Sequence, residues 1–364
     1  MDNTEVYVQT EKNVNEKWSQ NIRTLSVICS ILIILIHTYN TEQYGINSGV
    51  TYWLEIIISQ NLSRIAVPFF YISSAFLLYK KKYSYKYVLQ TRSRSVLVPF
   101  FIWNALYMFS FFILGLFGLV ENRIVQFSFY DIFQELFFYR SNYTFWFIYQ
   151  LILLILLYPI ISYTIKVLKN KSIILWLVMI IIYLFFGDFI PYNGPHLLCF
   201  SALIYYYLGA ILGTQYSNNM INVTEVLSRY KAWLFIIGLS LGTLMFIFID
   251  VLKIKSFVNC DLIRNISFLY VLYFIVDHFD LSIGGWISKI TFLIYAMHPI
   301  VLESIEKVFF RILPKSSTGA LIDYIVAPIL SLILIWIITK IWHIVLPRSY
   351  RICSGGRSTV NNSK

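Results

Sequence analysis

The chain has 364 residues, of which 58% are hydrophobic and only 13% are charged, and its mean hydropathy is +0.69. A soluble domain carries roughly 25% charged residues, so this composition excludes an ordinary soluble protein and indicates a polytopic membrane protein. The formal net charge of +11 does not require a nucleic-acid partner, because Lys and Arg collect in the cytoplasmic loops of membrane proteins.

The start of the chain is polar and mixed in charge from residue 1 to residue 21. It lacks the basic start, short apolar core and small-residue cleavage site of a secretory signal. We therefore expect a cytoplasmic N-terminal segment over 1–21, a single transmembrane domain over 22–346 and a cytoplasmic basic tail over 347–364. We expect this tail to lack regular structure.

The predicted fold is all-α, a membrane helical bundle of about ten transmembrane helices. Each apolar stretch is close to the ~20 residues that a bilayer requires. The stretches run approximately over 22–39, 62–79, 96–118, 145–165, 173–190, 197–213, 232–249, 262–276, 286–304 and 324–346.

The distribution of Lys and Arg predicts the orientation. The connection over 41–61 contains neither residue, whereas the next connection, over 80–95, contains several of both. Since cytoplasmic loops are enriched in these residues, we expect both termini to be cytoplasmic. No internal repeat is visible, which disfavours a transporter built from two related halves.

Three ionisable residues within the predicted spans fall at one level. The first span runs outward, and the fourteen residues from Arg23 to His37 rise by about 21 Å, which places His37 in the outer part of the membrane. The second span starts outside and carries Arg64 near its beginning, and His298 lies in the middle to outer part of the ninth span. Ionisable groups at such depths usually face a protein interior or a wet cavity.

Other interpretations of these residues are open. His37, at the end of a span, is equally consistent with an interfacial anchor. Arg64 is consistent with a side chain that extends to the outer headgroups. His298 is consistent with a histidine beside a helix kink whose imidazole has its hydrogen-bond partners. Trp146, at the start of the fourth span, has the character of an interfacial residue. Arg92 and Arg94 precede the third span, where phosphate groups can approach.

Several short motifs occur in an order that resembles the bacterial acyltransferase 3 family of integral membrane O-acyltransferases. They are the apolar first span ending in His37, the run from Arg64 to Leu78 that begins Arg-Ile-Ala-Val-Pro, Val98-Pro99-Phe100-Phe101-Ile102-Trp103, Phe145-Trp146-Phe147 and Ile294-Tyr295-Ala296-Met297-His298-Pro299. The resemblance covers nearly the whole chain. It departs from the family pattern in the first span, where the expected arginine position holds Ser26 and the nearest cation, Arg23, lies one helical turn earlier.

The resemblance implies an enzyme that moves an acyl group, usually acetyl, from cytoplasmic acyl-CoA to a hydroxyl of a cell-surface or lipid-linked glycan. It implies catalytic roles for His37, Arg64 and His298, an acyl-CoA side formed by Arg23, Arg92 and Arg94, and substrate contacts from Trp146, Tyr149 and Tyr295. A neutral imidazole is a suitable base for the alcohol nucleophile. Acetyl-CoA would be a donor substrate, with no permanently bound cofactor and no metal.

The resemblance also implies a multi-pass protein of the bacterial cell membrane, with the lipid bilayer, an acyl-CoA, a polysaccharide and separate glycan-assembly proteins as partners. A different class of function stays open from the residues alone. Intramembrane Arg and His would equally serve a translocation path, so a flippase or exporter for a glycan precursor or an acyl group is the alternative.

Overall fold

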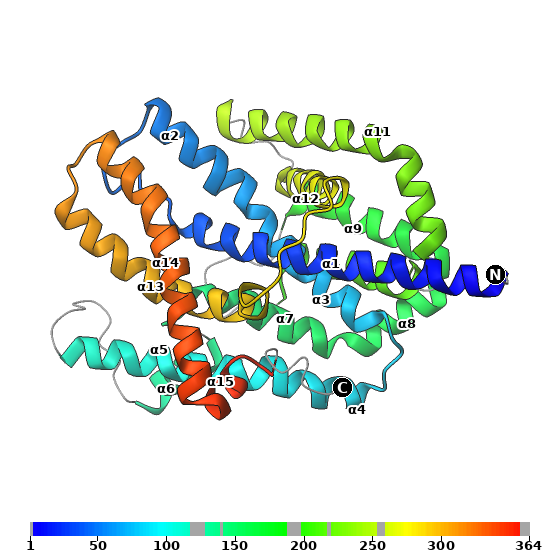
Figure 1. Ribbon diagram of the computed structural model, residues 1–364, viewed down its shortest axis with the longest axis horizontal. Helices are drawn as coiled ribbons and strands as arrows, with labels where there is room; N and C mark the ends of the chain where they lie inside the picture. The colour runs from blue at the N-terminus through cyan, green and yellow to red at the C-terminus, as the bar shows by residue number, and fades with distance from the viewer. Residues whose placement is uncertain are drawn as a thin grey trace.

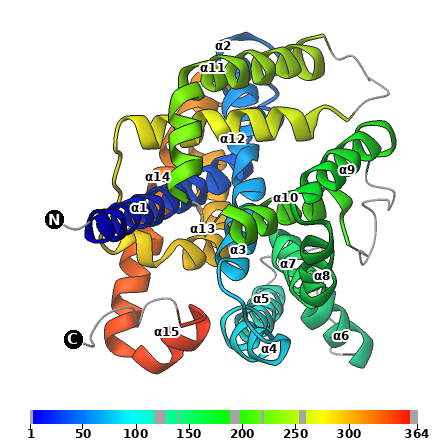
Figure 2. The same cartoon turned by 90° about the vertical axis from the view of Figure 1, so that its right-hand side faces the viewer.

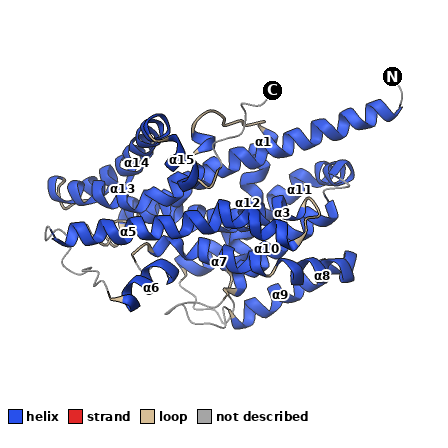
Figure 3. Cartoon of the chain, turned by 90° about the horizontal axis from the view of Figure 1, so that it is seen from below, coloured by secondary structure: helices blue, strands red, loops and turns tan. Residues whose placement is uncertain are grey.

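The computed structural model describes residues 3–116, 128–138, 141–187, 198–216, 220–252 and 259–356. All regular secondary structure in these ranges is helical (Figure 3). This confirms the prediction of an all-α fold.

Helix α1 (Asn3–His37) runs through the middle of the bundle, with the N-terminus projecting at one end (Figure 1). It contacts α3, α11, α12, α13 and α14. The other helices are α2 (Gly49–Glu55), α3 (Ala66–Tyr79), α4 (Tyr85–Arg92), α5 (Val98–Leu116), α6 (Phe129–Phe138), α7 (Trp146–Leu156), α8 (Tyr158–Leu168), α9 (Ser172–Phe186), α10 (Phe200–Ile211), α11 (Met220–Phe246), α12 (Asp261–His278), α13 (Thr291–Ile312), α14 (Ser317–Val345) and α15 (Pro347–Cys353).

A helix occurs at each of the ten predicted apolar stretches, but within the described ranges only 6 helical runs are both long and apolar enough to cross a membrane. The difference has a physical origin. Helices α7 and α10 are only 11 and 12 residues long, and α12 and α13 carry several charged residues. The structure thus describes a polytopic helical membrane protein, while the number of about ten spans stays a prediction.

Two prolines coincide with changes in helix type. Residues Gly49–Tyr79 form one helical run, which passes through a π-helical segment η1 (Ile56–Leu62) and a 3-10 turn η2 (Ser63–Ile65) just before Pro68. A second π-helical segment, η3 (Ser93–Leu97), lies just before Pro99. A proline removes one backbone hydrogen bond and its ring displaces the carbonyl four residues earlier, so the regular ladder is interrupted at these places.

Helices α3 and α10 lie side by side (Figure 2). Two glycines of the α10 segment lie at their contact. A Cβ added to Gly209 would lie 2.2 Å from the backbone oxygen of Ile72, and one added to Gly213, in the π-helical segment η6 (Leu212–Tyr216), would lie 2.7 Å from that of Phe76. Glycines four residues apart let two membrane helices approach closely. This contact fixes the position of α3, which carries part of the candidate site.

The C-terminal tail is partly structured, which corrects our expectation. Residues Pro347–Cys353 form α15, and Tyr350 is 1% exposed among the aromatic rings of Trp286, Trp342 and His343. The indole nitrogen of Trp103 in α5 donates to the Cys353 carbonyl at 3.1 Å. A helix of this length is not stable by itself in water, and burial of the large Tyr350 side chain stabilises it here. The last predicted residues of the tail, 357–364, lie outside the described ranges.

Candidate functional site

The structure places two predicted histidines side by side. His37 is the last residue of α1 and His298 lies in α13, and their ring centroids are 5.1 Å apart. His298 is fully buried, whereas His37 is partly exposed and its Nδ1 lies 3.4 Å from the Tyr143 hydroxyl. His298 therefore lies behind His37, at the interior of the bundle.

The proline that follows His298 explains its orientation. Pro299 has no N–H, so the carbonyl of Tyr295, four residues earlier, loses its normal helical partner. The Nδ1–H of His298 donates to that carbonyl at 2.7 Å. The Nε2 atom consequently carries the lone pair, and no described residue provides it with a hydrogen-bond partner.

His37 opens into a cavity of about 290 Å³, which we call the histidine pocket. Arg64 and Trp146, both predicted as site residues, line it, together with Pro68 and Tyr71 of α3. Arg64 is exposed and hydrogen-bonds the side chain of Gln60, one helical turn earlier. Polar and aromatic groups thus converge on one cavity, as they do in small-molecule binding sites.

A second cavity of about 270 Å³ lies between α1, α3, α7 and α13, and we call it the Arg92 pocket. Among the described residues that line it, Arg92 is the only one with a charge, and Ser26, Ser73, Ser74 and Thr291 supply hydroxyl groups. A cation with several hydroxyl donors is suited to an anionic group such as a phosphate.

Phe147 and Tyr295 line both pockets, so their rings separate the two cavities. Both are 7% exposed, and their ring centroids are 5.7 Å apart. The Tyr295 ring also stacks on Phe145 at 5.6 Å, and its hydroxyl donates to the Thr144 carbonyl. We call this pair the aromatic partition, and the hydrogen bond holds it in place.

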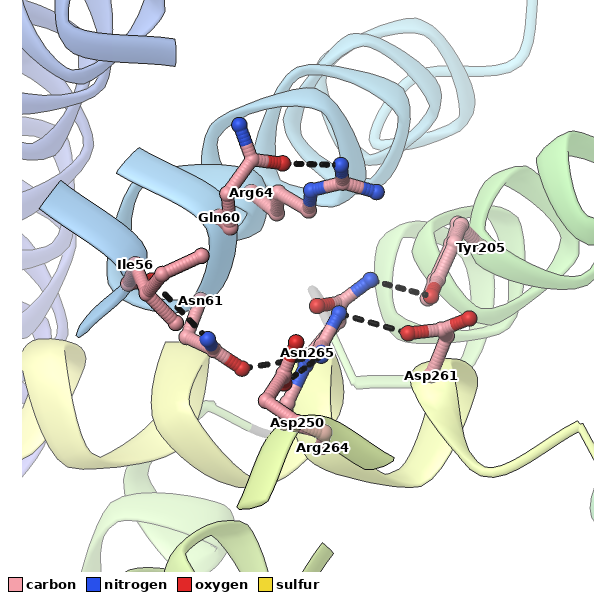
Figure 4. A network of polar contacts seen from close by, with 9 residues as sticks. All are labelled: Ile56, Gln60, Asn61, Arg64, Tyr205, Asp250, Asp261, Arg264 and Asn265. Carbon is pink, nitrogen blue, oxygen red and sulfur yellow. Dashed lines mark hydrogen bonds and ion pairs between the residues drawn. The ribbon is translucent and has the colours of Figure 1, made fainter. Parts of the chain in front are cut away.

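The wall of the histidine pocket on α12 holds a polar network that the sequence reading missed (Figure 4). Arg264 is 2% exposed, and its guanidinium contacts Asp261 at 2.6 Å, the Asn61 side-chain oxygen at 2.9 Å and Asp250 at 3.4 Å. Next to it, the Asn265 amide donates to the Tyr205 hydroxyl at 3.4 Å. An arginine within the apolar stretch 262–276 was the available signal, since intramembrane charges usually mark function.

The remaining predicted site residues lie elsewhere. Arg23 and Arg94 are exposed, and neither lines either pocket. Tyr149 lines neither pocket and packs its ring 6.2 Å from Phe138. Within the described part of the chain, no group of three or more His, Cys, Asp or Glu side chains is placed to hold a metal ion.

Comparison with known proteins identifies a family profile and two relatives that this chain resembles. The profile of a family described as "Acyltransferase domain" matches residues 20–340. A "Probable poly-beta-1,6-N-acetyl-D-glucosamine export protein" of Staphylococcus aureus (strain MSSA476) is 27% identical over 307 residues, which cover 77% of this chain and 81% of that protein. The "Succinoglycan biosynthesis protein ExoH" of Rhizobium meliloti (strain 1021) is 30% identical over 101 residues, 26% of each chain. No solved structure matches at a significant level.

Proposed function

Because this chain belongs to the acyltransferase domain family, we propose that it is a membrane O-acyltransferase for a bacterial surface glycan. It moves an acyl group, acetyl in the simplest case, from cytoplasmic acyl-CoA to a hydroxyl of a cell-surface or lipid-linked polysaccharide. The names of the relatives support a polysaccharide context, since one concerns export of poly-β-1,6-N-acetylglucosamine and the other biosynthesis of succinoglycan.

One observation carries the proposal: the histidine pocket and the Arg92 pocket meet at the aromatic partition. A donor and an acceptor that approach from opposite faces of a membrane require two such cavities with one thin barrier between them. In this proposal the phosphates of acyl-CoA bind near Arg92, and the pantetheine arm presents the thioester to the partition. The acceptor glycan occupies the histidine pocket.

His37 is the proposed general base of the reaction. It takes the proton from the acceptor hydroxyl as the oxygen attacks the thioester carbonyl carbon. The C–S bond then breaks, and the CoA thiolate leaves and takes up the proton that His37 holds. Arg64 lines the same pocket and would stabilise the oxyanion that forms on the carbonyl oxygen.

His298 acts on His37 in this proposal rather than on the substrate. Its Nδ1–H is committed to the Tyr295 carbonyl, so its Nε2 lone pair is available to a donor on the neighbouring ring. A hydrogen bond of this kind fixes the tautomer and orientation of an imidazole. His298 is thus a positioning residue for His37.

Glycan export is a second candidate function, favoured by the name of the Staphylococcus aureus relative. Export requires a path wide enough for a sugar chain, and the partition between the two pockets is closed by buried aromatic rings. A two-carbon acyl group needs only a small displacement of those rings. The geometry therefore favours acyl transfer.

The test replaces His37 by alanine in a strain that lacks the native protein, with His278→Ala as the matched control, because His278 is exposed and lines neither pocket. We expect His37→Ala to abolish the O-acetyl signal of the surface glycan in NMR spectra while polymer yield is unchanged. Loss of surface polymer with no change in O-acetyl content would instead support export.

A further inference from the structure

The α12 wall of the histidine pocket has features that the proposed chemistry at His37 does not use. It presents Asp261, Arg264 and Asn265 from one helix and Tyr205 from α10 (Figure 4). Taking a charge out of water costs several kcal/mol, and even paired charges recover this cost only where their geometry is good. A fully buried arginine in an apolar helix is therefore a feature that needs an explanation.

Unusual backbone geometry supports this wall. Asn61 lies in the π-helical segment η1, and Asp250 lies in another, η7 (Ile247–Val251). Both side chains contact the Arg264 guanidinium. In η1 the Asn61 amide also donates to the Ile56 carbonyl, which fixes its direction. Such π-helical segments occur frequently at functional sites.

The charges of the wall balance. Arg264 faces two carboxylates, those of Asp250 and Asp261, and Arg64 is the second cation near them. Two arginines with two aspartates leave no net charge to attract an anion. The wall is therefore suited to an uncharged polar ligand.

Two atoms of the wall are left unsatisfied. The Arg264 Nε and the Asn265 Oδ1 are buried and have no hydrogen-bond partner among the described residues. Leaving such a group unpaired costs about 1–3 kcal/mol. One atom is a donor and the other an acceptor, both residues line the histidine pocket, and sugar hydroxyls both donate and accept.

We propose that Arg264, Asn265, Asp261 and Tyr205 form a sugar-binding subsite that holds an uncharged sugar of the acceptor, next to the sugar that reacts at His37. Trp146 and Tyr183 line the same pocket, and their rings offer apolar surface to the C–H face of a sugar. The subsite rests on the proposed function for the identity of its ligand. It gives the enzyme a preference for an oligosaccharide over a single sugar.

The experiment measures binding of a β-1,6-linked N-acetylglucosamine tetrasaccharide to the purified full-length protein in lipid nanodiscs. Asn265→Leu keeps the branched side-chain shape and removes both hydrogen-bonding atoms. Arg264→Lys keeps the charge that faces the two aspartates and removes Nε. Ser267→Ala is the matched control, because Ser267 is on the same helix and does not line the pocket. Thermal melting confirms that each variant is folded.

We expect Asn265→Leu and Arg264→Lys to weaken tetrasaccharide binding about tenfold, as loss of one good hydrogen bond does. We expect Ser267→Ala to bind the tetrasaccharide as tightly as the wild type does. Wild-type affinity in a folded Asn265→Leu variant, equal weakening by Ser267→Ala, or no binding by the wild type would each overturn the subsite. If the wild type binds the tetrasaccharide through Asn265 but transfers no acyl group, the proposed function fails and the subsite stands.

Discussion

At the scale of single residues, Pro299 determines what His298 can do. The proline frees the Tyr295 carbonyl, and the His298 Nδ1–H takes that carbonyl as its partner. The histidine–proline pair in the sequence therefore determines the tautomer of His298.

Pro299→Ala should restore a backbone donor to the Tyr295 carbonyl and loosen the hold on His298. We expect kcat to fall about 10-fold to 100-fold, which is part of the factor that a well-positioned general base supplies, with KM for acyl-CoA unchanged. Pro328→Ala, at a proline inside α14, is the control and should retain activity. Equal kcat values for Pro299→Ala and the wild type would contradict the orienting role.

The three predicted acyl-CoA arginines provide their own comparison. Arg92 lines the Arg92 pocket, whereas Arg23 and Arg94 are exposed and line neither pocket. We expect Arg92→Gln to raise the KM for acyl-CoA about tenfold, consistent with loss of one charge-assisted hydrogen bond. Arg23→Gln and Arg94→Gln should change it less than twofold. Steady-state kinetics in nanodiscs would show whether this order holds.

Arg23 does not line the Arg92 pocket, although Ser26, three residues later in α1, does. Ser26 lines the Arg92 pocket at the position where the resembled family pattern has an arginine. Three residues on a helix amount to almost one full turn, and the small remaining rotation and the shift along the axis leave the Arg23 side chain exposed. A separation of about one turn therefore does not bring Arg23 into the pocket.

At the scale of secondary-structure elements, the α3–α10 contact depends on the absence of side chains at Gly209 and Gly213. Gly209→Ala would place a Cβ against backbone, which cannot rotate away. We expect a loss of stability of about 1–3 kcal/mol, typical of overpacking, measured as a lower thermal midpoint in detergent. Gly284→Ala is the control, because nothing lies within 4 Å of a Cβ at that position. Equal midpoints for the two variants would refute the close-contact argument.

A second element-scale contact joins α1, α11 and α12 at Asp277. Its carboxylate contacts Lys231 at 2.5 Å, Asn21 at 3.0 Å and Lys17 at 3.6 Å. Partial burial raises the pKa of Asp277, but the hydrogen bonds and charges of these neighbours outweigh it, so the pKa lies below its ordinary value.

At pH values above the ordinary carboxyl pKa of about 3.9, the lowered pKa of Asp277 stabilises the folded state. This contribution is lost as the pH falls through the folded-state pKa. We expect Asp277→Asn to lower the stability of the folded state by about 1–2 kcal/mol at neutral pH. Below pH 4 the difference in stability between the variant and the wild type should become smaller. Asp280→Asn, at an exposed position, should match the wild type at both pH values in thermal melts.

At the scale of the whole molecule, the all-α fold and the helix positions follow from composition and hydropathy, because these report transfer into lipid directly. The pairing of His37 with His298 was predicted only as a shared depth. Lateral contacts such as Arg264 with Asn61 join residues 203 positions apart. They depend on helix packing and π-helical segments, which no local pattern in this sequence encodes.

The aromatic partition gives a prediction at this scale. Tyr295→Ala would remove the ring that separates the two pockets and let water from the histidine pocket reach the thioester. We expect release of CoA thiol without acceptor to rise severalfold, measured with a thiol reagent. Tyr149→Ala, at a tyrosine of α7 that lines neither pocket, should leave this rate unchanged. A basal rate equal to that of the wild type would show that the partition does not exclude water.

The partition also has an electrical consequence. Where two water-accessible cavities are separated by a thin layer of aromatic rings, most of the transmembrane voltage falls across that layer. A charge that crosses 100 mV changes its energy by about 2.3 kcal/mol, whereas a neutral acetyl group changes it by nothing. Transfer across the partition would thus proceed independently of the membrane potential for acetyl, whereas the potential would change the energy of transfer for a charged acyl group such as succinyl.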